Sequence, residues 1–293
     1  IELVQTEKSQ IIQKSGLLEM VKLREQMDDI GGLEKLKPWL VQKSRIFADW
    51  PAARDFGVES PKGLMIVGMP GCGKSLTAKA TASLFGLPLL KMDMGSLMGK
   101  YVGESEGNMR RAIAVAEAVS PCVLWVDEVE KAFAGIGSGA AGSEVATRLF
   151  GYFLTWMQEK TAQVFVVTTA NDISVLPPEL LRKGRFDEIF YVDFPNEAER
   201  KAIFRVHLDK RKKMNQQIDL HKLAKATDKY SGADIESIVK EGIERAFLAN
   251  RAELDTQRLM QVIEATHPLG MVMKDKVKQY QNRFAEMKIK SAS

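Results

Sequence analysis

Short apolar runs alternate with longer amphipathic stretches over the middle of the chain. The apolar runs predict buried strands, and the stretches between them have the spacing of apolar positions that predicts helices. Strands that alternate with helices form a parallel sheet covered on both faces, so the expected fold class is α/β with a five-stranded parallel sheet. The expected strands are 64–67, 88–92, 122–126, 164–169 and 189–192, and the expected helices are 75–85, 106–118, 143–159 and 178–181.

After Pro195 the pattern changes to helices alone, and the polar run that begins with Asn196 is typical of a helix N-terminus. Helices are expected at 197–210, 220–227, 231–251 and 253–265, together with weaker helical patterns at 1–27, from about 33, and from 267 onward; 51–61 is expected to be a connector. The expected domains are an N-terminal helical linker (1–27), a large α/β domain (28–195), a small all-helical domain (196–266) and a helical tail (267–293).

A glycine-rich loop follows the first expected strand and opens the first expected helix. It reads Gly68-Met69-Pro70-Gly71-Cys72-Gly73-Lys74-Ser75, which fits the phosphate-loop pattern G-x-x-x-x-G-K-[S/T] in its strand–loop–helix setting. Glycines let backbone N–H groups approach an anion, and the helix N-terminus adds partial positive charge. We expect Lys74 to reach the outer phosphates of a nucleotide and the Ser75 hydroxyl to ligate Mg²⁺. The alternative is a purely structural turn. The residues expected at the nucleotide are Pro70, Gly71, Cys72, Gly73, Lys74, Ser75 and Leu76.

Two carboxylates, Asp127 and Glu128, follow the third expected strand. A carboxylate at this end of the sheet can hold Mg²⁺ directly or through water, which is the role expected for Asp127. Glu128 points the other way off the strand and is expected to polarise a water for attack on the γ-phosphate. The alternative is that the pair only caps a following helix.

Composition narrows the class of protein. The chain has 293 residues, 45% hydrophobic and 27% charged, which is ordinary for a globular protein. A net charge of +4 gives no argument for a nucleic acid or a membrane surface as partner. Two cysteines make no disulfide framework, three histidines form no metal-binding pattern, and no apolar run or leader targets a membrane. We expect a reducing compartment such as the cytoplasm or a plastid stroma. Because Ile1 stands first, the sequence is compatible with a fragment of a longer protein.

Residues from about 28 to 266 resemble the AAA+ ATPases, in particular the branch with the membrane-bound protease FtsH, the proteasomal ATPases and the cell division cycle protein 48 unfoldases. The resemblance rests on the phosphate loop, the Asp127-Glu128 pair and further motifs in the order that the family has. It implies a P-loop NTPase domain followed by a helical lid, with ATP and Mg²⁺ as ligands. The phrase 121–128, together with Pro268-Leu269, is most similar to cyanobacterial and plastid-encoded AAA+ proteins of unassigned role.

The resemblance implies roles for further residues. Asp29-Ile30-Gly31-Gly32-Leu33 is similar to the family's adenine-side loop, and Asn171 matches sensor 1, which helps to position the attacking water. Arg182 and Arg185 match the arginine fingers that reach the γ-phosphate of a neighbouring subunit. Without the resemblance, two solvated surface arginines would be the simpler interpretation. The lid positions that touch adenine and ribose in the family correspond to His207, Gly232 and Ala233.

Tyr101 and Val102 resemble the aromatic and apolar residues of the central pore loop, with which ring-shaped unfoldases grip an extended polypeptide. The alternative is that Tyr101 is a buried anchor of its loop. The glycine-rich run 135–142 lies where the family has its second pore loop.

Three departures limit the resemblance. Ser75 stands where this branch usually has threonine, and Gln158-Glu159-Lys160 stands where it often has Asp-Gly, which puts signalling between subunits in doubt. There is no zinc-protease H-E-x-x-H pattern, so no protease activity is expected.

The expected function is Mg²⁺-dependent hydrolysis of ATP to ADP and phosphate by a homo-oligomeric ring, with six subunits expected. The ring is expected to remodel or thread a protein partner, with no nucleic acid and no membrane segment. One rival is a nucleic-acid motor or loader, which the modest charge does not favour. Another is a nucleotide-dependent switch or scaffold with little turnover.

Overall fold

The computed structural model describes residues 12, 15–97, 104–133, 141–182, 184–250 and 252–293. The chain divides into two compact units. We call the first the sheet unit (Ile1–Gln26, Pro38–Val67 and Thr77–Phe190) and the second the loop-and-lid unit (Met27–Lys37, Gly68–Leu76 and Tyr191–Ser293).

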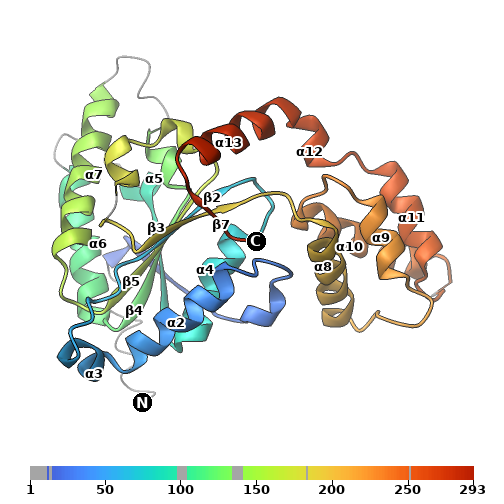
Figure 1. Cartoon of the computed structure of the whole chain (residues 1–293), viewed down its shortest axis with the longest axis horizontal. Coiled ribbons are helices and arrows are strands. Elements are labelled where there is room, and N and C mark those ends of the chain that lie inside the picture. The colour runs from blue at the N-terminus through green and yellow to red at the C-terminus, as the bar shows by residue number, and fades with distance from the viewer. Residues whose placement is uncertain (1–11, 13–14, 98–103, 134–140, 183, 251) are drawn as a thin grey trace. The chain divides into compact units, whose positions relative to one another are not determined.

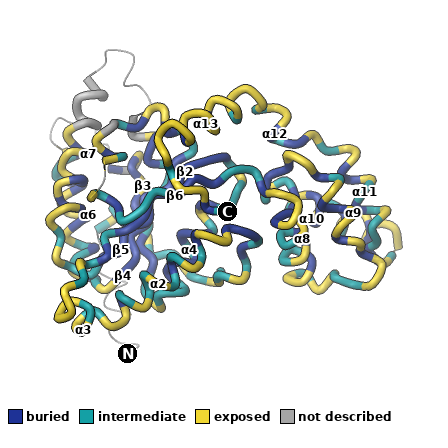
Figure 2. Tube along the Cα trace, viewed as in Figure 1, coloured by how far each residue is buried: buried dark blue, intermediate teal, exposed yellow. Residues whose placement is uncertain are grey.

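The strands form one mostly parallel sheet in the order β1-β3-β4-β5-β2-β6-β7, which confirms the α/β fold class (Figure 1). The central pairs β3 with β4, β4 with β5 and β5 with β2 are all parallel. Every residue of β2 and β5 is buried, as expected for strands covered on both faces (Figure 2). The strands are β1 (Leu18–Val21), β2 (Gly63–Gly68), β3 (Leu89–Asp93), β4 (Cys122–Asp127), β5 (Val164–Ala170), β6 (Glu188–Val192) and β7 (Lys290–Ser291).

The predicted count of five strands is wrong, because both outer strands, β1 and β7, were missed. The helix expected over 1–27 is also wrong at Leu18–Val21, which pairs antiparallel with β3 from Leu18 opposite Met92 to Val21 opposite Leu89. The apolar residues there fit helical spacing and strand alternation about equally well. Pairing with the otherwise open edge of β3 decides between the two, and such pairing is not visible locally.

Helices cover the sheet unit on two sides, with α2 and α4 on one side of the strands and α6 and α7 on the other (Figure 1). The rings of Phe47, Phe85 and Phe165 lie 4.8–6.2 Å apart and join α2, α4 and β5. On the other side, the indole N–H of Trp156 donates to the Glu117 carboxylate at 2.8 Å, from α7 to α6. The helices are α2 (Leu36–Ala48), α3 (Trp50–Asp55), α4 (Lys74–Phe85), α5 (Met94–Leu97), α6 (Glu104–Val119) and α7 (Ala141–Glu159).

Several predicted boundaries need correction. The helix expected from about 33 begins at Leu36, and the expected connector 51–61 begins inside α3, where Pro51 occupies the first turn, which tolerates proline. The segment 178–181 is a 3-10 helix rather than an α-helix. The 3-10 helices are η1 (Met27–Asp29), η2 (Val129–Phe133), η3 (Ile173–Val175) and η4 (Pro178–Leu181).

The four helices predicted after Pro195 are confirmed in the loop-and-lid unit. Capping boxes open two of them, Asn196 with Glu199 and Ser231 with Asp234, so side chains satisfy backbone N–H groups that the helix itself leaves unpaired. The last helix begins at Thr256 rather than 253, because Asp255 is its N-cap. The helices are α8 (Glu197–Lys210), α9 (Leu220–Ala226), α10 (Gly232–Leu248) and α11 (Thr256–Ala265), and they enclose an apolar core that includes Phe204, Leu208, Ile235 and Leu259.

The tail is helical at α12 (Leu269–Val272) and α13 (Lys274–Glu286) and then ends in β7, which the helical prediction missed. The Phe284 ring of α13 stacks on Tyr191 with 3.9 Å between centroids. The Ala292 N–H donates to the Tyr191 carbonyl at 2.8 Å, beside β6. Among the residues that the structure describes, no helix is both long and apolar enough to cross a bilayer.

Candidate functional site

The phosphate loop, in the loop-and-lid unit, depends on its glycines. The backbone φ angles of Gly68, Gly71 and Gly73 are 141°, 74° and 87°, in a region that residues other than glycine rarely adopt. A Cβ on Gly68 would lie 2.0 Å from the Val192 carbonyl oxygen, and one on Gly71 would lie 2.8 Å from the Ser231 hydroxyl oxygen. Helix α4 begins at Lys74, within the last two residues of the loop, so its N-terminal N–H groups face the same region.

Lys74 and Cys72 set the charge of this loop. Lys74 is buried, and its ammonium donates to the carbonyls of Gly68 and Met69 at 2.9 and 2.6 Å. Burial raises the pKa of the Cys72 thiol to about 12, so the thiol is neutral near pH 7. The loop therefore offers a cation and backbone donors with no negative charge from its cysteine, which suits a phosphate.

The start of α10 packs against the phosphate loop. The Ala233 N–H donates to the Gly71 carbonyl at 2.9 Å, and a Cβ on Gly232 would lie 3.2 Å from the same oxygen. Ile203 of α8 lies close to both Gly232 and Gly31: a Cβ on Gly31 would lie 2.7 Å from Ile203 Cγ1. The unit thus brings Gly232 and Ala233 of the predicted lid residues next to the phosphate loop, and it adds Ile203, which was not predicted.

His207 lies on α8 beside a charged group of residues. Its Nδ1 is 3.3 Å from the guanidinium of Arg211, which also binds the Glu236 carboxylate at 2.8 Å. Burial lowers the pKa of His207, so its ring is neutral near pH 7. The described residues contain no cluster of three His, Cys, Asp or Glu side chains able to hold a metal ion.

In the sheet unit, Asp127 at the end of β4 is fixed by two neighbours. The Thr169 hydroxyl donates to Asp127 Oδ1 at 2.6 Å, and the Lys91 ammonium lies 3.3 Å from Oδ2. Lys91 also lies over the Trp125 ring, 4.7 Å from its centroid. The carboxylate is therefore held in place at the carboxyl edge of the sheet.

Glu128 has an unusual backbone and a defined set of partners. Its φ of 48° is in the left-handed region, and its N–H donates to the Thr169 hydroxyl at 3.1 Å. The Asn171 side-chain amide donates to Glu128 Oε1 at 3.2 Å, and the Lys131 ammonium pairs with Oε2. Thr169, Lys91, Asn171 and Lys131 thus hold the Asp127-Glu128 pair within the described part of the chain.

Three further residues hold this group and were missed from the sequence. Thr169 bridges Asp127 and Glu128, Lys131 pairs with Glu128, and Glu130 accepts the Asn171 backbone N–H at 2.9 Å. Burial raises the pKa of Glu130, whose Oε2 is buried without a hydrogen-bond partner in the described part of the chain. No spacing rule points to Thr169 or Glu130, because their role depends on pairing between β4 and β5.

The predicted arginines lie between η4 and β6. Arg182 is exposed and Arg185 is half-buried. Their segment is attached to the start of β2, because the Asp187 carboxylate accepts the N–H groups of Lys62 and Gly63 at 3.0 and 3.2 Å. The predicted pore-loop residues Tyr101 and Val102, and most of the second run 135–142, lie outside the described residues.

Comparison with known proteins gives matches over most of the chain. Residues 64–194 match the "ATPase family associated with various cellular activities (AAA)", and residues 217–261 match the "AAA+ lid domain". The chain is 47% identical over 288 residues to an "Uncharacterized AAA domain-containing protein ycf46" of Pyropia yezoensis, covering 98% of this chain and 58% of that protein.

Two more relatives extend the comparison. The ycf46 protein of Guillardia theta is 42% identical over all of this chain and 57% of its own length. A "Cell division cycle protein 48 homolog" of Archaeoglobus fulgidus is 34% identical over 73% of this chain and 29% of its own length. The chain therefore spans a little over half the length of the ycf46 proteins it matches.

Proposed function

The chain belongs to the AAA family of ATPases and carries the family's ATPase domain and lid, and from that premise we propose that it hydrolyses ATP to ADP and phosphate in a ring of identical subunits. The observation that carries the proposal is the Glu128 carboxylate, held by the Asn171 amide on a left-handed backbone. A carboxylate held in this way is suited to act as general base.

The residues of the phosphate loop fit a nucleotide. The glycines leave room for an anion, the N-terminus of α4 supplies N–H donors, and the buried Lys74 supplies positive charge. Ser75 and Asp127 would hold Mg²⁺, which when bound offsets the charge of the phosphates. Gly31, His207, Gly232 and Ala233 would hold the adenine and ribose.

In the proposed reaction Glu128 accepts the proton of the attacking water. The Asn171 side chain keeps the Glu128 carboxylate in one orientation. The Glu130 carboxylate accepts the backbone N–H of Asn171 and so keeps Asn171 in place. Thr169 supports both Asp127 and Glu128. Arg182 and Arg185 would act on the nucleotide of the neighbouring subunit, where a planar guanidinium offsets charge on the γ-phosphate.

We further propose that the ring remodels or threads a protein, with Tyr101 and Val102 contacting the polypeptide. This class of activity is what the resemblance of these two residues to the central pore loop of ring-shaped unfoldases implies. Cys72 and Cys122 form no disulfide among the described residues, which is compatible with the reducing compartment expected from the sequence.

A switch with little turnover is the second candidate, and the ion pairs favour it. Both carboxylates form ion pairs with lysines: Asp127 with Lys91, and Glu128 with Lys131. Lys131 therefore competes with water for Glu128. Replacing Lys131 with methionine should raise the hydrolysis rate if this pair limits turnover, and leave it unchanged or lower it otherwise.

The experiment that tests the main proposal measures ATP hydrolysis per subunit with Mg²⁺ over a range of protein concentrations. A rate that rises steeply and then saturates supports a ring in which residues act across subunits. Glu128→Gln should bind ATP but hydrolyse it at least about 100-fold more slowly, the usual contribution of a general base. Near-normal turnover of Glu128→Gln would contradict the role of this residue.

Mixing inactive variants tests the arginines. Arg185→Ala and Glu128→Gln should each be inactive alone, but a random mixture should recover activity at about a quarter of the interfaces of a closed ring. At each of these active interfaces, an Arg185→Ala subunit supplies Glu128 and its Glu128→Gln neighbour supplies Arg185. A mixture as inactive as its parts would contradict action across subunits.

A further inference from the structure

The loop of residues 29–33, which the resemblance places on the adenine side, lies directly against the first turns of α8. A Cβ on Gly31 would lie 2.7 Å from the Ile203 backbone nitrogen, and one on Gly32 would lie 2.5 Å from Glu199 Oε1. No side chain fits at either position, so the backbone of the loop touches the helix itself. The loop's position therefore depends on the residues at the start of α8.

Glu199 is the residue of α8 that binds this loop. Its Oε1 accepts the Leu33 N–H at 3.2 Å, and its Oε2 accepts the Asn196 N–H at 2.9 Å in the capping box. Leu33 has a φ of 60°, a conformation that is unfavourable for a bulky residue and needs support from its surroundings. The hydrogen bond from its N–H to a buried carboxylate supplies such support.

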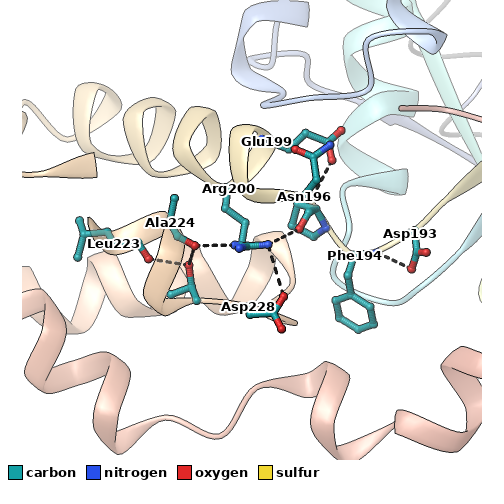
Figure 3. Close-up of polar contacts among 10 residues, drawn as sticks. Asp193, Phe194, Asn196, Glu199, Arg200, Leu223, Ala224 and Asp228 are labelled. Carbon is teal, nitrogen blue, oxygen red and sulfur yellow. Dashed lines mark hydrogen bonds and ion pairs between the residues drawn. The ribbon is translucent and has the colours of Figure 1, made fainter. Parts of the chain in front are cut away.

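The start of α8 is itself firmly anchored. Arg200, the residue after Glu199, donates to the carbonyls of Ala224 and Pro195 at 2.9 and 2.8 Å. Figure 3 shows its guanidinium between Ala224 and Asp228. Arg200 is buried, and Asp228 lies 4.0 Å from its guanidinium. Glu199 is thus attached to a rigid part of the lid rather than to a loop.

Residues 290–293 form a third segment, which contacts both Glu199 and the chain just after the 29–33 loop. The Ser293 hydroxyl donates to Glu199 Oε1. The Ala292 carbonyl accepts the N–H groups of Lys35 and Leu36 at 2.9 and 3.1 Å, just after the loop. Ala292 is fully buried, so this short segment fills a defined place.

We propose that Glu199 is a positioning residue for the 29–33 loop, and that residues 290–293 lock Glu199 and the loop together so that bound nucleotide leaves slowly. The inference rests on the proposed function, because it takes this loop to contact the nucleotide base. Glu199 touches no reacting atom, and it acts through the backbone of Leu33. The lock therefore sets nucleotide affinity and release rather than the rate of bond cleavage.

The test uses four variants of the full chain. Glu199→Ala removes the acceptor for all three segments, and Glu199→Gln keeps an oxygen that can accept from Leu33. Ala292→Pro removes the N–H that donates to Tyr191 and leaves Glu199 intact, which guards against a Glu199→Ala protein that fails to fold. Glu197→Ala is the matched control, because Glu197 lies on the same turn of α8 but is exposed and paired with His221.

Three readouts separate the possible results: deuterium uptake, release of ADP and single-turnover hydrolysis. Deuterium uptake at residues 30–36 without nucleotide should rise in Glu199→Ala and Ala292→Pro and stay unchanged in Glu197→Ala. Release of a fluorescent ADP should be about tenfold faster in Glu199→Ala, the factor that corresponds to one charge-assisted hydrogen bond. Release should be faster by a smaller factor in Ala292→Pro, which removes a neutral hydrogen bond. The rate of ADP release from Glu199→Gln should lie between that of Glu199→Ala and that of the wild type. Hydrolysis in a single turnover at saturating ATP should change much less than release.

Each contrary result has its own meaning. Unchanged deuterium uptake in Glu199→Ala and Ala292→Pro would overturn the lock. Faster uptake with wild-type ADP release would overturn its role in holding nucleotide. If the wild type itself binds no ADP, the proposed function fails, and the uptake readout still tests the contact between Glu199 and the loop.

Discussion

The Thr169 hydroxyl donates a hydrogen bond to the Asp127 carboxylate at 2.6 Å and accepts one from the backbone N–H of Glu128, the residue after Asp127. One buried hydroxyl on β5 thus holds the Asp127 carboxylate and the Glu128 backbone at the end of β4. Such a bridge keeps the proposed Mg²⁺ ligand and the proposed general base in a constant relation to one another.

Replacing Thr169 with valine should therefore lower both stability and activity. Valine has the same shape but leaves the half-buried Glu128 N–H without this acceptor, which costs about 1 to 3 kcal/mol in the free energy of unfolding. Turnover should fall by about tenfold or more, since each such hydrogen bond orients a group in the site. Urea unfolding and steady-state ATP hydrolysis measure the two effects.

Thr168 provides a matched control on the same strand. It is fully buried, and its hydroxyl has no hydrogen-bond partner within the described residues. Thr168→Val should therefore be neutral or stabilising, because no bond is lost and a buried polar group is removed. Equal effects of the two substitutions would contradict a specific role for Thr169.

Glu130 should matter as an acceptor rather than as a charge. Glu130→Gln keeps an oxygen for the Asn171 N–H and should retain turnover within about threefold, whereas Glu130→Leu should lose about tenfold with unchanged ATP affinity. Turnover and ATP binding, each measured for both variants, distinguish these results. If the glutamine variant were as slow as Glu128→Gln, Glu130 would have to act on the reaction directly.

The sequence was sufficient for the features that local pattern determines. The phosphate loop, the central strands and the lid helices follow from apolar periodicity, glycine spacing and N-cap residues. In contrast, β1 and β7 form because they pair with edges supplied by distant parts of the chain. The local sequence of 18–21 and of 290–291 does not reveal those partners.

The same distinction holds at the candidate site. Asp127 and Glu128 could be predicted because they follow an apolar strand, but the left-handed φ of Glu128 could not. Thr169 matters only because the parallel register of β4 and β5 brings it to Asp127. Glu199 looks like an ordinary capping-box residue in the sequence, and its contacts to Leu33 and Ser293 come from segments 166 and 94 residues away.

Cys72 should react slowly with alkylating reagents despite its place in a loop. Burial raises the pKa of its thiol to about 12, compared with about 8.5 for a free cysteine. Because only the thiolate attacks, iodoacetamide at pH 8 should modify the folded chain about 1,000-fold more slowly than the urea-unfolded chain. A Cys122→Ala background isolates the signal in mass spectrometry, and modification at the unfolded rate would show that the thiol is accessible and ionised.

Lys160, which follows α7 where related ATPases often have Asp-Gly, should make the folded chain less stable near neutral pH. Burial lowers the pKa of Lys160 to about 8; the nearby charge of Lys62 lowers it further, and the charge of Asp187 opposes the shift. The pKa of a lysine in an unfolded chain is about 10.4. Below pH 8 both states carry the charge, so the cost of burying it is fully present. Between pH 8 and 10.4 the unfolded chain binds more protons, so the free energy of unfolding rises with pH.

Lys160→Met removes this cost and should be more stable than the wild type at pH 7 by about 1 to 3 kcal/mol, since one pKa unit corresponds to about 1.4 kcal/mol. The advantage should shrink towards zero by pH 10, as the wild type loses its proton. Urea unfolding of both proteins at pH 7 and 10 measures the difference, with Lys201→Met, an exposed lysine, as the control. A variant less stable than the wild type at both values of pH would mean that the weak hydrogen bond from Lys160 to the Pro61 carbonyl, 3.4 Å long, outweighs the cost of burial.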